Sequence, residues 1–200
     1  SNWQQALRQL IDRIEGIGVL VMVSGVVGSN TYRKLDPDEF RGFALADPIA
    51  PLIFVNGADT KAAQIFTLIH ELAHIWLGGS ALSDAAMTAN GGPEVERWCN
   101  QVAAEVLVPL EALADDYQGI LNARELERLS ERYRVSTLVL LKRLHDAKVL
   151  SWGEYLTAYE DEKNRVMSIL AKKRSEGGGG NYYYTCLLYT SPSPRDRQKS

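Results

Sequence analysis

The segment His70-Glu71-Leu72-Ala73-His74 constrains this chain most strongly, because two histidines stand four residues apart within an apolar run. Residues four apart lie on the same face of an α-helix, so both imidazoles could bind one metal ion. Glu71 lies about 100° around the helix and can reach the open side of that ion. A zinc hydrolase needs this combination of two nitrogen ligands and a carboxylate. The alternative is a helix with two ordinary histidines.

The residues around this motif predict a well-defined helix. Asn56-Gly57-Ala58-Asp59-Thr60 indicates a turn with an N-cap at Asp59 or Thr60, and Gly78-Gly79 indicates the end of the helix. Between these signals apolar residues recur at helical spacing: Ala63, Phe66, Ile69, Ala73, Trp76 and Leu77. The histidines border this apolar face, where a polar pair is costly to bury unless a partner satisfies it. Of the 3 histidines in the chain, two are in the motif, which favours a metal site.

A second predicted helix, from Pro93 to Pro109, supplies the candidate third ligand. Proline suits the first turn of a helix and also stops one, as Pro109 does here. Steps of about 100° per residue leave Glu96 as the only acid on the inward half of this helix. We therefore expect His70, His74 and Glu96 to hold zinc, with manganese or iron as alternatives. The other interpretation of Glu96 is a buried acid paired with an arginine.

Two neighbours of Glu96 on this helix also have predicted roles. Asn100 lies one turn further on and could hydrogen-bond a ligand histidine, or it could be an amide that packs between helices. Cys99 falls on the apolar stripe, so we expect a small core residue and not a nucleophile. With Cys186 set aside as part of the tail, Cys99 cannot form an internal disulfide, which favours a reducing, cytoplasmic setting.

Together with longer stretches, these residues resemble the ImmA/IrrE family of metallo-endopeptidases, found in phages, mobile elements and bacterial stress regulators. The resemblance is strong from Glu39 to Pro109 and weaker from the N-terminus to about Tyr155, and its main stretches are 40–45, 50–56, 66–74 and 96–109. It implies a minimal zincin-like fold, with His70, His74 and Glu96 as ligands and Glu71 as the general base. It also implies a protein substrate, a helix-turn-helix repressor of the element that encodes the protein.

The chain is expected to form an α+β, zincin-like domain at 1–118, a helical extension at 119–175 and a disordered or non-native tail at 176–200. The first domain should contain a helix at 2–16, a loop at 25–38, and a three-stranded sheet from strands at 19–23, 39–46 and 52–56. The 39–46 strand is our candidate for a sheet edge to which an extended substrate could add.

The helical extension resembles a helix-turn-helix between Asn122 and Lys148, with a tight turn at Arg134-Val135-Ser136. Its second helix carries three basic residues that would suit phosphate contacts: Lys142, Arg143 and Lys148. Nearby acids balance these charges, so we favour a small helical subdomain over a DNA-binding one. We expect His145 to be a surface or packing residue, and Ser151 to Glu154 to form the capping box of a final helix.

Composition and charge narrow the classes of protein to which the chain could belong. The formal net charge of -3 gives no broad basic field for nucleic acid, and no stretch is apolar and long enough to cross a membrane. The sequence begins with neither a signal peptide nor a methionine, so we expect a fragment or a processed chain. The segment from Cys186 to Ser200 resembles a translated sequencing adapter, the alternative being a genuine disordered tail.

These observations predict a cytoplasmic zinc-dependent endopeptidase that acts on a repressor. Glu71 would take a proton from water as the water attacks a peptide carbonyl, and would pass that proton to the leaving nitrogen. One alternative is a non-catalytic metal-binding regulator that binds a repressor or DNA. Another is a degenerate domain that has lost its metal.

Overall fold

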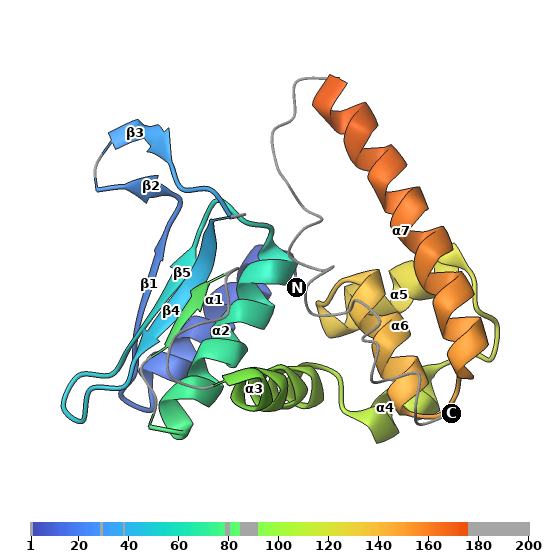
Figure 1. The fold of residues 1–200 in the computed structure, drawn as a ribbon, viewed down its shortest axis with the longest axis horizontal. Coiled ribbons are helices and arrows are strands. Elements are labelled where there is room, and N and C mark those ends of the chain that lie inside the picture. Colours follow the sequence, from blue (N-terminus) through green and yellow to red (C-terminus); the bar gives the residue numbers. More distant parts are fainter. Residues whose placement is uncertain (1, 29, 38, 79–80, 85–91, 176–200) are drawn as a thin grey trace. The chain divides into compact units, whose positions relative to one another are not determined.

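The computed structural model describes residues 2–28, 30–37, 39–78, 81–84 and 92–175 (Figure 1). Within these residues the chain forms seven helices and six strands. They belong to two compact units, which divide between Val106 and Leu107. None of the helices described is long and apolar enough to cross a membrane.

The N-terminal unit is a mixed sheet with helices. Its elements are α1 (Trp3–Glu15), β1 (Leu20–Ser24), β2 (Val26–Val27), β3 (Asn30–Lys34), β4 (Phe40–Leu45), β5 (Leu52–Asn56), α2 (Lys61–Trp76), β6 (Ala81–Asp84) and α3 (Gly92–Leu107). The main sheet has the order β1-β5-β4-β6, with β1 parallel to β5 and the other pairs antiparallel. Strands β2 and β3 form a separate antiparallel pair. This arrangement confirms the predicted α+β class.

The three predicted strands are present as β1, β4 and β5, but two predictions about the sheet are wrong. The sheet has a fourth strand, β6, which pairs with β4, so the 39–46 segment is internal and not at the edge. Four residues are too few to show an alternating pattern, and pairing with β4 is what makes Ala81–Asp84 a strand. The predicted loop at 25–38 also contains β2 and β3, which turn at Gly28, where φ is +57°.

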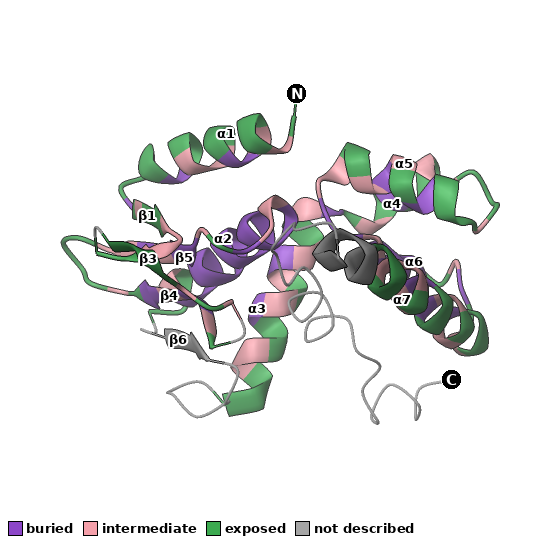
Figure 2. Cartoon of the chain, turned by 90° about the horizontal axis from the view of Figure 1, so that it is seen from above, coloured by how far each residue is buried: buried purple, intermediate pink, exposed green. Residues whose placement is uncertain are grey.

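Helix α2 is the centre of this unit. Thr60, one of the two predicted N-caps, accepts a hydrogen bond from the backbone N–H of Ala63, and Gly78 follows the helix with φ at +68°. Every residue from Ala62 to His74 is buried, as the purple of α2 in Figure 2 shows. A helix that is buried all round lies inside a domain. Helices α1 and α2 cover one face of the sheet, so the motif lies in the core of this unit (Figure 1).

The C-terminal unit is helical and has its own core. It contains α4 (Leu110–Asp116), α5 (Ala123–Tyr133), α6 (Thr137–Asp146) and α7 (Trp152–Ser175). Leucines of α5 and α6 pack with Tyr155 and Tyr159 of α7. Ser136 caps α6 as predicted, and Ser151 and Glu154 form the predicted capping box. The fold class of a zincin-like domain with a helical, helix-turn-helix-like extension is confirmed.

One of the three basic residues predicted to suit phosphate contacts is buried inside the C-terminal unit. Most of α6 is buried, and Arg143 donates to the carbonyl oxygen of Val108. Lys142 pairs with Asp146 one turn along the same helix, and Lys148 is exposed. Phosphate contact through Arg143 is therefore excluded in this fold. His145 stacks on Tyr155 with ring centroids 5.1 Å apart, which confirms the predicted packing role.

Candidate metal centre

Helix α2 places the two motif histidines side by side. The Nε2 atoms of His70 and His74 lie 3.1 Å apart, and the ring centroids are separated by 4.8 Å. Both rings are buried, with 1% and 3% of their side chains exposed. Two buried imidazole nitrogens at this separation require a shared partner or proton, because a polar pair is costly to bury unsatisfied.

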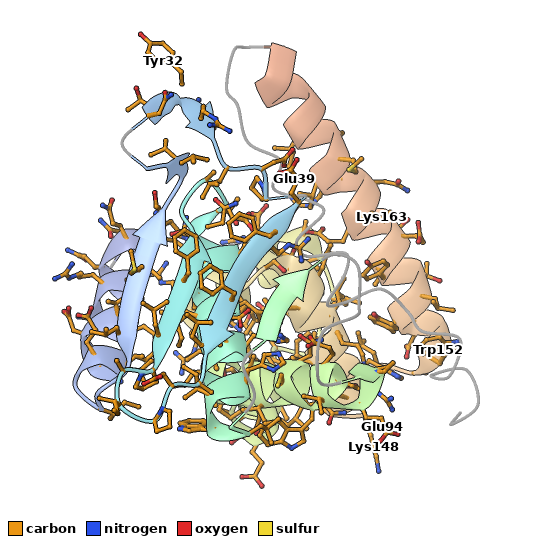
Figure 3. The ribbon with its side chains drawn as sticks, turned by 60° about the vertical axis from the view of Figure 1, so that its left-hand side comes forward. Tyr32, Glu39, Glu94, Lys148, Trp152 and Lys163 are labelled. Carbon is orange, nitrogen blue, oxygen red and sulfur yellow. The ribbon has the colours of Figure 1, made fainter. Side chains whose placement is uncertain are left out.

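Helix α3 brings Glu96 to the same point. Its Oε2 atom lies 3.3 Å from Nε2 of His70, and its Oε1 atom lies 3.2 Å from Nε2 of His74. In the described part of the chain, the ion-pair partners of Glu96 are these histidines and not an arginine. Glu94, in the first turn of α3, is exposed (Figure 3). The structure thus brings together the three residues that the sequence predicts as metal ligands.

The spacing of these donor atoms fits a divalent metal ion. The two imidazole nitrogens are 3.1 Å apart, and each lies 3.2 to 3.3 Å from a different carboxylate oxygen of Glu96. The edge of a tetrahedron is about 1.6 times its centre-to-corner distance, so ligand bonds of about 2.0 Å give an edge of about 3.3 Å. An octahedron with bonds of about 2.2 Å gives a similar edge, so the spacing alone does not select the metal. Two imidazole nitrogens with one carboxylate oxygen are typical of zinc.

The charges of the site agree with this fit. Burial lowers the pKa of His74, but hydrogen bonds from its imidazole to Cys99 and Glu96, together with nearby charge, outweigh this effect and raise that pKa to about 10. Hydrogen bonds with His70 and then His74 lower the pKa of Glu96 to about 2. The raised pKa of His74 and the lowered pKa of Glu96 both favour a protonated imidazole beside an ionised carboxylate. A metal ion binds the neutral imidazole, so it would replace that proton and accept the same carboxylate.

The remaining predicted site residues occupy different surroundings. Glu71 is fully buried on α2. Asn100 lies one turn after Glu96, and its Oδ1 atom is buried without a hydrogen-bond partner among the residues described. The predicted hydrogen bond from Asn100 to a histidine is absent from that part of the structure, and its supporting role stays a prediction. Cys99 is fully buried, which confirms the predicted core position.

Two neighbours of the motif were missed by the sequence argument. Thr67 is buried one turn before Glu71, and Gly42 of β4 lies against both residues. The helical spacing of Thr67 and Glu71 signals their shared face, because residues four apart are neighbours on a helix. Nothing in the sequence pattern indicates that Gly42 is the residue opposite them.

One comparison with known proteins bears on this site. A peptidase family described as the IrrE N-terminal-like domain matches residues 14–145, which is more than half of the chain. The matched region includes all three donor residues and Glu71. No curated protein matches the chain.

Proposed function

The chain belongs to the IrrE N-terminal-like family of metallopeptidases, and from this membership we propose that it is a zinc-dependent endopeptidase. A peptidase family implies a peptide or protein substrate. The observation that carries the proposal is the pair of imidazole nitrogens 3.1 Å apart, each 3.2 to 3.3 Å from an oxygen of Glu96, with Glu71 on the same helix as the two histidines. We propose a repressor of a phage or mobile element as the substrate, on the strength of the resemblance alone.

In the proposed mechanism three residues bind the metal ion and a fourth transfers a proton. His70, His74 and Glu96 would hold the cation, which when bound polarises a peptide carbonyl and makes a water molecule more acidic. Glu71 accepts a proton from the attacking water as the new C–O bond forms. It then donates that proton to the amide nitrogen as the C–N bond breaks, so the carboxylate is restored at the end of the cycle.

The substrate is expected to approach from the side of Glu96. The Glu96 side chain is 32% exposed, whereas the histidine side chains are almost completely covered. An extended substrate also needs a strand with free backbone groups. Because β4 is paired on both sides, we propose β6, the strand at that end of the sheet, in place of the 39–46 segment.

Glu71→Gln tests this function without a known substrate. The probe is a proteome-derived peptide library, incubated with the zinc-loaded full chain and searched for new termini by mass spectrometry. We expect cleavage by the wild-type chain and a loss of about 100-fold or more in the variant, which should keep its zinc. Equal cleavage by the variant would contradict the role of Glu71. Zinc binding without cleavage by the wild type would favour a non-catalytic regulator.

A further inference from the structure

Gly42 lies where β4 passes under α2, and a side chain would not fit there. A Cβ atom on Gly42 would lie 2.6 Å from the carbonyl oxygen of Phe54 and 2.7 Å from Cγ2 of Thr67. It would also lie 3.5 Å from Cγ of Glu71. Atoms that are not bonded normally approach to about 3.5 Å. The backbone of Gly42 is not in the left-handed region, so conformation does not require glycine here. Glycine is required because there is no space for a side chain.

The strand at Gly42 cannot easily move away from the helix. Gly42 is buried and pairs with Val55 of β5 on one side and Ser83 of β6 on the other. The backbone at Gly42 therefore forms a fixed surface under α2. The three atoms nearest to the position of its missing Cβ belong to Phe54, Thr67 and Glu71, and none belongs to a metal ligand.

Thr67 meets this surface through its methyl group. It is 1% exposed, and its hydroxyl has no hydrogen-bond partner among the residues that the structure describes. A buried hydroxyl without a partner lowers stability, so the visible contribution of Thr67 at this point is shape. Its Cγ2 methyl and the Glu71 side chain, one turn apart on α2, lie side by side against Gly42.

We propose that Gly42 and Thr67 are positioning residues that fix the direction of the Glu71 carboxylate. The position of the missing Cβ of Gly42 lies within 3.5 Å of both Cγ of Glu71 and Cγ2 of Thr67, so the strand and the Thr67 methyl bound the space beside the Glu71 side chain. The inference rests on the proposed role of Glu71 as the general base. A catalytic group displaced by about 1 Å can lose about 100-fold in rate, so a small shift of Glu71 would matter while the three ligands stay in place.

Four variants of the full chain distinguish a specific effect on the position of Glu71 from a general effect on the fold. Gly42→Ala adds a methyl group that collides with Phe54 and Thr67 beside Glu71, and Thr67→Ala removes the methyl that shares this space. Thr67→Val is the matched control, since it keeps the Cγ2 methyl and replaces the hydroxyl with a second methyl. Gly57→Ala is the control for a crowded glycine, because its Cβ would lie 3.0 Å from the backbone nitrogen of Gly25 and near no site residue.

Each variant is measured by zinc content, by the carboxyl ¹³C resonance of Glu71 and by cleavage of the peptide library. Labelled glutamate supplies the resonance, which is identified as the signal missing from Glu71→Gln. We expect Gly42→Ala and Thr67→Ala to keep zinc, shift this resonance and lose about 100-fold in cleavage. The two control variants should match the wild type in all three measurements.

An unchanged Glu71 resonance in both Gly42→Ala and Thr67→Ala would overturn the proposal, whether or not the chain cleaves peptides. Equal shifts in Thr67→Val or Gly57→Ala, or zinc loss in step with the shift, would also overturn it. If Gly42→Ala does not fold, Thr67→Ala against Thr67→Val decides alone. A shifted resonance in a chain whose wild type cleaves nothing would reject the endopeptidase and still support the positioning.

Discussion

The Nε2 atom of His74 and the Oε1 atom of Glu96 lie 3.2 Å apart, although the two residues belong to different helices. His70 completes the set from the same helix as His74. A cation held between these atoms would therefore connect α2 to α3. Binding at such a site should stabilise the folded N-terminal unit, because the unfolded chain does not hold the three ligands together.

Removal of zinc should lower the thermal unfolding temperature of the full chain. Zinc at a free concentration of 100 times its Kd stabilises a folded protein by about 2.7 kcal/mol. Calorimetry of the zinc-loaded chain with and without a chelator measures the effect. Glu96→Ala is the control, and we expect the chelator to change its unfolding far less. A chelator effect of equal size in both proteins would contradict the ligand role of Glu96.

Arg143 is predicted to stabilise the C-terminal unit and to contribute nothing to DNA binding. Arg143 is 5% exposed, and its Nε and Nη2 atoms donate to the carbonyl oxygen of Val108 over 2.9 and 2.7 Å. Arg143→Met should lower the free energy of unfolding by about 1–3 kcal/mol, because that carbonyl loses its donors. Chemical denaturation measures the change.

Lys142→Met is the control for this measurement. Lys142 pairs with Asp146 one turn away at the surface, so its loss should cost about 0.5 kcal/mol or less. Equal effects of the two substitutions would show that the contact of Arg143 with Val108 carries no special weight.

Asp116 should make the C-terminal unit sensitive to acid. A hydrogen bond from Tyr133 and the charge of Arg132 lower the pKa of Asp116 below its ordinary value of 3.8. A carboxyl with a lowered folded pKa stabilises the fold above its unfolded pKa, and this stability is lost as the pH falls through the folded value. Asp116→Asn should therefore lower the unfolding temperature at about pH 7 and have little effect at about pH 2.

Thermal unfolding of the Asp116→Asn variant and the wild type across this pH range gives the test. The two curves should converge as the pH falls. A difference that stays constant with pH would mean that Asp116 contributes through shape and not through charge.

The candidate site was largely predictable from local helical geometry. The spacing of His70 and His74 and the inward position of Glu96 follow from about 100° per residue, and the structure brings the three residues together. Capping residues such as Ser136 and Ser151 were predictable for the same reason, since their hydrogen bonds reach only three residues along the chain.

Features that depend on contacts distant in sequence were not predictable in this way. β6 is a strand because it pairs with β4, and the space requirement at Gly42 arises from Phe54 and Thr67. The partner of Arg143, the carbonyl of Val108, is equally remote, so its basic charge alone suggested phosphate contact. A single sequence does not encode these pairings in its local periodicity.

The zinc content of the wild-type chain and of Glu96→Ala tests the central claim most directly. Both proteins are loaded with zinc, dialysed in parallel and analysed by elemental mass spectrometry, with the fold checked by circular dichroism. Three ligands from two helices predict about one zinc ion per wild-type chain and little or none in the folded variant. A folded wild-type chain that retains no zinc, or a variant that retains as much as the wild type, would contradict the proposed metal centre.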